Sequence, residues 1–379
     1  MKSLVFKVKI LSMAAVLLTG LIACGIGGDT GQLSLSLTDA ATDMYNAVYV
    51  TIREVDVQNA DDPEDSWTVV STPNKTINLL ALANGVREQL ALADLAAGHY
   101  TQLRLIIGDT QDGGANILSQ AHPFANYVID DADQYHEMKV PSGLQTGVKI
   151  VQGFDINENS TTELILDFSA TRSVVVAGKS EKYLLKPTIQ VLDTALASII
   201  SGSVTKAADQ TAVEGALVSA QVYDPLAADI KDQVVVRAST LSTEAGAYKL
   251  FIAAGAYNLV AGKSAFATSA AAVTATADAT TTQDFSLAAA DMGTVAGTAS
   301  IASAGDETFV TLSFRQTVNL GGTDVVVEIM SINVANGAPY SVELPAGLYS
   351  VVSSTLGKTT QQADVTVSAA TTLTFDVSF

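Results

Sequence analysis

Short stretches in which polar and apolar residues alternate recur along the chain, and this period of two limits the fold more than any other feature. In residues 32–37, for example, Leu33, Leu35 and Leu37 are separated by serines, which is the pattern of a strand with one buried face. Turn-forming residues separate these stretches, and Thr, Val and Ala dominate after residue 200 without a helical period. The sequence therefore predicts an all-β protein built from consecutive β-sandwiches.

Three local features refine this prediction. Residues 47–57 alternate in two phases that differ by one position, which predicts a β-bulge near Arg53 and Glu54. Residues 77–82 are expected to form a short helical turn before an Asn-Gly pair. Thr38, Asp39 and Asp43 are interpreted as turn formers whose side chains bond their own backbone. Further strands are predicted at residues 67–70, 101–107, 127–129, 146–155, 162–168 and 182–191.

A repeat of about 91 residues relates two blocks in the second half of the chain. The stretch A-G-A-Y that ends at Tyr257 recurs as A-G-L-Y ending at Tyr349, and a similar A-G-H-Y ends at Tyr100. In each, the Gly allows the chain to reverse and the Tyr opens a strand. We expect these tyrosines to form corners of the core, with each hydroxyl bonded back to the backbone, rather than ligand contacts.

Charge and composition exclude several classes of function. The chain carries 39 Asp and Glu against 20 Lys and Arg, a formal charge of -19, whereas nucleic-acid binding depends on basic residues. One Cys and three His exclude a disulfide framework and a Cys/His zinc site. No G-x-S-x-G or phosphate-binding glycine motif is present, and only His99, His122 and His136 could act as a base. We therefore predict no catalytic residues and no enzymatic activity.

Two acidic loops, at residues 61–65 and 130–137, supply hard oxygen ligands of the kind that Ca²⁺ takes. Neither has the spacing of an EF-hand, and acidic loops in so acidic a protein are usually solvated surface. No cofactor is expected, and calcium held by the second loop stays open as an alternative. Its candidate ligands are Asp130, Asp131, Asp133 and Glu137. Trp67, the only Trp, is expected at the core or its rim rather than as a sugar platform.

The N-terminus indicates the compartment. Three lysines precede a mostly apolar stretch, residues 10–23, which is shorter than the about 20 residues of a spanning helix and is typical of a signal peptide. The sequence L-I-A-C, ending at the only cysteine, Cys24, resembles the lipobox of bacterial lipoproteins. That resemblance implies a signal peptide at residues 1–23, a lipid on Cys24 and a flexible tether over residues 24–31. Gly25, in place of an Asp, implies sorting to the outer membrane.

Several stretches between residues 31 and 193 occur in a fixed order: G-Q-L-S-L-S-L-T-D-A from Gly31, L-L-A-L from Leu79, A-G-H-Y from Ala97, P-S-G-L-Q-T-G from Pro141, L-D-F from Leu166 and K-Y-L-L-K-P from Lys182. Together they resemble the bacterial family called domain of unknown function 4382. The resemblance implies a lipoprotein β-domain at residues 32–193 and no particular activity.

The second block carries another set of stretches: G-S-V-T from Gly202, V-E-G-A-L-V from Val213, T-E-A-G-A-Y from Thr243 and A-G-A-Y from Ala254. They resemble carboxypeptidase regulatory-like modules, which are β-sandwiches of the prealbumin-like type. The resemblance covers residues 199–288, with a diverged second copy at residues 292–379. Such modules are accessory spacers or binding platforms, and some relatives of this carbohydrate-binding-like fold bind carbohydrate.

These observations lead to one functional hypothesis and one alternative. The chain is expected to be a non-catalytic lipoprotein with three Ig-like or prealbumin-like sandwiches. It would be anchored by lipid in the outer membrane, on the periplasmic or the exposed face, for display, adhesion or binding of an extracellular protein or polysaccharide. The alternative is a carbohydrate-binding or calcium-assisted accessory module of a polysaccharide system.

Overall fold

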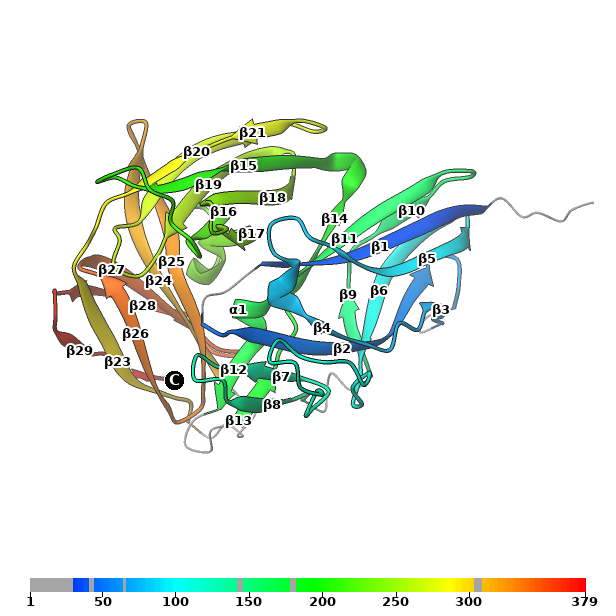
Figure 1. The fold of residues 1–379 in the computed structure, drawn as a ribbon, viewed down its shortest axis with the longest axis horizontal. Helices are drawn as coiled ribbons and strands as arrows, with labels where there is room; N and C mark the ends of the chain where they lie inside the picture. The colour runs from blue at the N-terminus through cyan, green and yellow to red at the C-terminus, as the bar shows by residue number, and fades with distance from the viewer. Residues whose placement is uncertain (1–29, 41–43, 64–65, 142–145, 178–181, 303–308) are drawn as a thin grey trace, which may run out of the picture.

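The computed structural model describes residues 30–379 except 41–43, 64–65, 142–145, 178–181 and 303–308 (Figure 1). Strands make up 62% of the structure and helices 4%, which confirms the all-β prediction. The strands form paired sheets around three large apolar cores. We call the paired sheets around these cores the first, second and third sandwich, in chain order.

The first sandwich packs two sheets face to face. One has the order β14-β11-β1-β5, with β1 and β11 parallel, and the leucines that alternate along β1 are fully buried, as their spacing predicts. The strands of this sheet are β1 (Thr30–Ala40), β5 (Glu88–Ala96), β11 (Thr161–Ser169) and β14 (Ile189–Asp193). The facing sheet is built around β2 (Ala47–Asn59), with β3 (Thr68–Ser71), β4 (Lys75–Asn78), β6 (Gly98–Ile107), β7 (Tyr127–Ile129), β8 (Tyr135–Lys139), β9 (Val148–Ile150), β10 (Phe154–Ile156), β12 (Val174–Ala177) and β13 (Lys182–Leu185).

Most local predictions for this part of the chain are confirmed. The register of β2 against β6 shifts between Ile52 and Glu54, which is the predicted bulge. The expected helical turn is the 3-10 helix η1 (Leu79–Leu82), and a second short helix, α1 (Ala170–Ser173), follows β11. The long strands predicted at residues 146–155 and 182–191 were wrong, because each is divided in two. In the second case Pro187 lies at the break, where it has no N–H to donate to a strand ladder.

The second and third sandwiches repeat one topology. In the second, β18-β15-β21 with β22 faces β17-β16-β19-β20; in the third, β26-β23-β29 with β30 faces β25-β24-β27-β28. The second contains β15 (Ala197–Lys206), β16 (Leu217–Tyr223), β17 (Val234–Leu241), β18 (Ala247–Ala253), β19 (Gly255–Gly262), β20 (Ser269–Ala275), β21 (Thr280–Thr282) and β22 (Phe285–Leu287), with 3-10 helices η4 (Thr194–Leu196) before it and η5 (Ile230–Gln233) within it. The third contains β23 (Met292–Ser300), β24 (Phe309–Leu320), β25 (Thr323–Ala335), β26 (Ala338–Pro345), β27 (Gly347–Ser354), β28 (Gln361–Val367), β29 (Thr372–Thr374) and β30 (Val377–Ser378).

The predicted tyrosine corners are present in all three sandwiches. Tyr100, Tyr257 and Tyr349 are buried, and each hydroxyl donates to the carbonyl four residues earlier, at 3.1, 2.9 and 2.8 Å respectively. A further tyrosine in each repeat, Tyr248 or Tyr340, donates to a carbonyl between the two short strands of its own sheet. A buried hydroxyl is satisfied in every case, so these side chains are structural.

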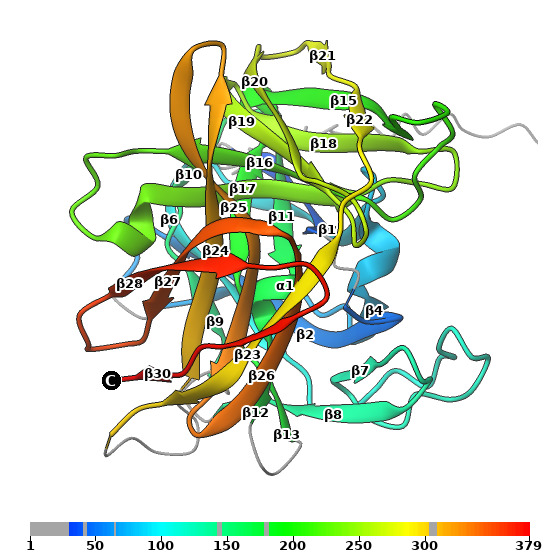
Figure 2. The same ribbon diagram turned by 90° about the vertical axis from the view of Figure 1, so that its left-hand side faces the viewer.

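The sandwiches are packed against one another rather than strung out in a line. Strand β12 of the first pairs with β25 of the third at Val176 and Val334, so one sheet of 14 strands runs through both. Figure 2 shows the third sandwich in front, the second above it and the first behind. The side chain of Gln221, from the second sandwich, bonds both backbone groups of Glu328 in the third, at 2.7 and 2.8 Å. Arg172, from α1 beside the first sandwich, pairs with the Glu328 carboxylate at 2.8 Å, so residues from all three sandwiches meet there.

Two glycines in equivalent strands allow a close approach of the backbone in each repeat. A Cβ built on Gly202 of β15 would lie 1.9 Å from the carbonyl oxygen of Gln283, between β21 and β22. One built on Gly297 of β23 would lie 2.0 Å from the carbonyl oxygen of Phe375, between β29 and β30. These contacts are with backbone, so the neighbouring segments themselves would have to separate. The close approach explains why both repeats carry a Gly at this point of the strand.

Replacing Gly202 by Ala is therefore expected to destabilise the protein by about 1–3 kcal/mol through overpacking. The control is Gly262→Ala in β19, where an added Cβ meets nothing within 4 Å and the change should be within about 0.5 kcal/mol of neutral. Urea unfolding followed by circular dichroism would measure both midpoints. Equal midpoints for the two variants would contradict the packing described for β15.

Candidate functional site

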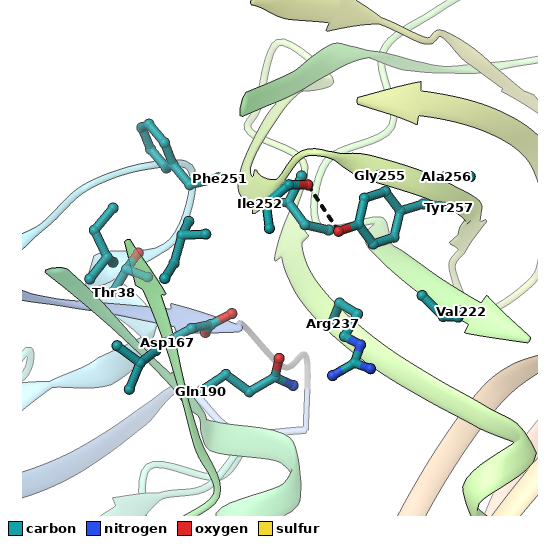
Figure 3. A pocket seen from close by; sticks show the side chains of 14 residues that line it. Thr38, Asp167, Gln190, Val222, Arg237, Phe251, Ile252, Gly255, Ala256 and Tyr257 are labelled. Atoms are coloured by element: carbon teal, nitrogen blue, oxygen red, sulfur yellow. Dashed lines mark hydrogen bonds between the residues drawn. The ribbon is translucent and has the colours of Figure 1, made fainter. Parts of the chain in front are cut away.

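A cleft of about 370 Å³ lies between the first and second sandwiches (Figure 3). This volume is within the range of small-molecule sites, about 300–1,000 Å³. One wall is the outer face of the sheet formed by β1, β11 and β14, and the other is formed by β16, β17 and the turn from β18 to β19. The cleft combines polar side chains from the first sandwich with an arginine and apolar groups from the second.

The wall from the first sandwich presents a row of polar side chains. Thr38 on β1 lies opposite Asp167 on β11, and Asp167 lies opposite Gln190 on β14. Residues in register on neighbouring strands point to the same face, so the strand pairing itself brings these three side chains together. Figure 3 shows Asp167 and Gln190 extending toward the second sandwich.

The wall from the second sandwich is formed at a tyrosine corner. The chain turns between β18 and β19 at Ala253 and Gly255, and the Tyr257 hydroxyl bonds to Ala253 across that turn. Small residues at the turn leave space that larger side chains would fill. Arg237, on β17, lines the same space and is exposed.

Direct contacts hold the two walls at a fixed separation. Gln190 donates from Nε2 to the carbonyl of Val236, at 2.9 Å. At one side of the cleft the backbone N–H of Asn84 donates to the Thr240 hydroxyl, also at 2.9 Å. The guanidinium of Arg87 lies 4.2 Å from the centre of the Phe251 ring, a cation–π contact. The cleft is therefore built into the packing of the two sandwiches.

Thr38 and Asp39, next to this cleft, correct a sequence interpretation. Their side chains do not bond their own turn: the Thr38 hydroxyl donates to the carbonyls of Leu82 and Val86, and Asp39 Oδ1 accepts from the backbone N–H of Ala170. Thr38 and Asp39 belong to β1 and are buried, so tertiary contacts replaced the local ones that short polar side chains prefer elsewhere. The third predicted turn former, Asp43, lies outside the described residues.

Asp39 is a buried carboxyl group, and few hydrogen bonds offset the cost of its burial. Burial raises its pKa well above the usual value, and the nearby charge of Asp167 raises the pKa further, although the hydrogen bond from Ala170 opposes both effects. Its Oδ2 atom has no hydrogen-bond partner among the described residues. A carboxyl in this setting keeps its proton at a pH where an exposed one has lost it.

The sign of the resulting pH dependence follows from linkage. Because the folded pKa of Asp39 lies above the unfolded one, of about 3.9, its contribution to stability is present at low pH. That contribution is lost as the pH rises toward the folded pKa. Asp39→Asn keeps the acceptor for Ala170 without the titrating charge. The free energy of unfolding of this variant should therefore fall less as the pH rises, and at neutral pH the variant should be more stable than wild type.

Urea unfolding of wild type and Asp39→Asn between about pH 4 and pH 8 would test this, with the exposed Asp131→Asn as the matched control. We expect the Asp39→Asn variant to gain stability over wild type as the pH rises, and the control to follow wild type. A constant difference across the range would contradict a raised pKa at Asp39.

The predicted calcium ligands lie in and next to the turn between β7 and β8: Asp130, Asp131, Asp133 and Glu137. Asp130 accepts from two backbone N–H groups of this turn and lies 2.7 Å from His136 Nε2, and the hydrogen bond with His136 lowers the pKa of Asp130. Asp133 accepts from the side chain of Asn46. No group of three or more acidic, His or Cys side chains in the described part of the chain is placed to hold a metal ion. The calcium hypothesis therefore rests on the sequence alone.

The three histidines all belong to the first sandwich. His99 is exposed and lies 2.7 Å from a carboxylate oxygen of Asp155, and His122 is buried 2.8 Å from the Tyr127 hydroxyl. His136 stacks on the ring of Tyr183. Each imidazole is thus engaged with neighbours of its own sandwich.

Trp67 is half-buried at the rim of the first sandwich. The guanidinium of Arg104 lies 4.3 Å from its ring centre, and the Lys149 ammonium lies 5.6 Å from it. This placement confirms the expected position at the rim of the core.

The lipidation site predicted at Cys24, together with the signal peptide and most of the tether, lies outside the described residues. Within the part of the chain that is described, no helix is long and apolar enough to cross a membrane.

Sequence reasoning missed the residues that form the cleft. Asp167 and Gln190 occur in predicted strands, and the alternation of those strands does mark them as facing away from the first core. What the sequence lacks is the second wall, since nothing in the residues around Arg237 indicates which sheet it will face. Packing between sandwiches, and not a motif, creates this site.

Solved structures give only weak likenesses. The Bacillus anthracis TIE protein is 12% identical over 93% of this chain and 50% of its own, with a TM-score of 0.21. A streptococcal ancillary pilin is 10% identical over 91% of this chain and 99% of its own, with a TM-score of 0.21. The shaft pilin SpaA from Lactobacillus rhamnosus GG is 8% identical over 48% of this chain and 96% of its own, with a TM-score of 0.20. Scores this low do not establish a shared fold, and the chain spans only half the length of the TIE protein.

The sequence comparisons are more specific for the first sandwich. No curated protein matches the chain. A family model does match residues 30–187, which confirms the resemblance seen between residues 31 and 193. Its description is "Domain of unknown function (DUF4382)", and the first sandwich of this chain is similar to that family.

Proposed function

We propose that the protein is a non-catalytic outer-membrane lipoprotein that displays its sandwiches or binds a partner through them. In this proposal the membrane is the first partner, reached through a lipid on Cys24. The second partner is a protein or polysaccharide outside the membrane.

One observation about geometry carries the proposal. Strand β1 begins at Thr30, six positions after Cys24, and six residues of extended chain span at most about 20 Å. In Figure 1 β1 begins at one end of the long axis, and the third sandwich lies toward the other end. A lipid on Cys24 would keep the start of the first sandwich near the bilayer and hold the third sandwich away from it.

The contacts between sandwiches support the same conclusion. The shared sheet at Val176 and Val334 and the Gln221–Glu328 bonds join the sandwiches without depending on a linker alone. A body joined in this way holds its distal surface away from the start of the first sandwich, which suits display and adhesion.

The anchor is tested by replacing the only cysteine. Cys24→Ala should abolish incorporation of labelled palmitate and move the protein from the membrane to the soluble fraction, because each buried lipid CH₂ contributes about 0.8 kcal/mol of membrane affinity. Treatment of wild-type cells with globomycin, an inhibitor of the lipoprotein signal peptidase, should lead to accumulation of the uncleaved precursor. A Cys24→Ala protein that still fractionates with the outer membrane would overturn the proposal.

The alternative, a carbohydrate-binding module of a polysaccharide system, is favoured by the cleft between the first and second sandwiches, where polar side chains stand beside apolar ones. A glycan array probed with the purified protein separates it from protein-directed adhesion. Binding to one class of glycan would support the carbohydrate alternative, whereas signals at background for all glycans would favour a protein partner.

A further inference from the structure

Arg237 differs from the other arginines that lie between strands or sandwiches. Arg87, Arg104, Arg172 and Arg315 each bond to a carboxylate or a carbonyl. Arg237 makes no hydrogen bond or ion pair within the described residues, although the chain holds nearly two acids for each base. It lines the cleft between the first and second sandwiches.

The cleft that Arg237 lines also contains an acidic side chain. Asp167 lines the same cleft from the opposite wall, and no ion pair joins it to Arg237 among the described residues. Gln190 is held by its Nε2 bond to Val236. Figure 3 shows the amide oxygen of Gln190 turned into the cleft.

We propose that this cleft binds a small organic carboxylate that also carries hydrogen-bond donors. The guanidinium of Arg237 would bind the carboxylate, since Arg presents paired N–H groups that match its two oxygens. Hydroxyl or ammonium groups of the ligand would donate to Gln190 and to the carboxylate of Asp167 on the opposite wall. The inference deepens the proposed binding function, on which it rests.

The lining also limits what else the ligand can be. Two aromatic side chains line the cleft, and neither is free: Phe251 already has Arg87 and Lys249 at 4.2 and 4.8 Å from its ring centre, and Tyr257 is buried in its corner. The lining therefore offers no platform for a stacked base or an aromatic ligand. The volume of the cleft and its mixed polar and apolar lining suit a ligand of one or two sugar rings or amino-acid residues. A uronic acid unit and a short peptide with a free carboxylate share this chemistry.

Binding of two probes to the full-length protein distinguishes these sources: D-glucuronate, with hydroxyl donors, and glycylglycine, with an ammonium donor. D-glucose is the matched probe without a carboxylate. Isothermal titration calorimetry should show saturable binding of at least one carboxylate and none of glucose at the same concentration. The carboxylate that binds more tightly shows whether the ligand is a uronic acid or a short peptide.

Arg237→Gln should weaken that binding at least tenfold, which corresponds to about 1.4 kcal/mol, because it removes a charge-assisted contact. Arg53→Gln removes the same charge from the exposed bulge of β2, away from the cleft, and should leave the affinity unchanged. Circular dichroism would verify that both variants are folded.

The proposal fails if neither carboxylate binds at tens of millimolar, if glucose binds equally well, or if Arg237→Gln binds like wild type. None of these outcomes bears on the membrane anchor, since palmitate labelling and fractionation of the Cys24→Ala variant are measured independently. Loss of the anchor with retained binding, or the reverse, would therefore show which of the two proposals is wrong.

Discussion

The arrangement of the three sandwiches depends on one buried carboxylate, Glu328. Burial alone would raise the pKa of Glu328, but Arg172 and the Ser313 hydroxyl lower it enough to leave the pKa below its usual value. The pair with Arg172, at 2.8 Å, joins the first sandwich to the third, while Gln221 of the second bonds the backbone of the same residue. Removing one partner of a buried ion pair costs about 3–5 kcal/mol, so the ionised form holds this junction together.

That junction has a consequence for the cleft between the first and second sandwiches. Three sandwiches that meet at one point cannot also pack flat against one another along their whole length, because each is a twisted sheet pair. Away from Glu328 the first and second sandwiches touch at separate points, among them the hydrogen bonds of Gln190 and Asn84 and the contact of Arg87 with the Phe251 ring. The cleft is the space that remains between these contacts.

The features predicted from sequence are those that depend on residues close together in the chain. The alternation in β1, the bulge beside Arg53 and the corner at Tyr257 each follow from a local pattern and a local steric rule. Asp39 was misinterpreted because its hydrogen-bond partner, Ala170, lies 131 residues away, and nothing in the local sequence indicates so distant a partner. Glu328 and Arg237 were missed for the same reason: their environments are made by packing between sandwiches.

Charge gives the cleft its selectivity. A formal charge of -19 repels anions, but screening limits this repulsion to about 8 Å at physiological ionic strength. Within that range an approaching carboxylate meets Arg237, whose guanidinium no described carboxylate neutralises, and the field of the nearest base outweighs that of distant acids. Asp167 on the opposite wall then disfavours a ligand that is purely anionic and favours one that also offers donors. The two walls together therefore select for a ligand with a carboxylate at one end and hydroxyl or ammonium groups at the other.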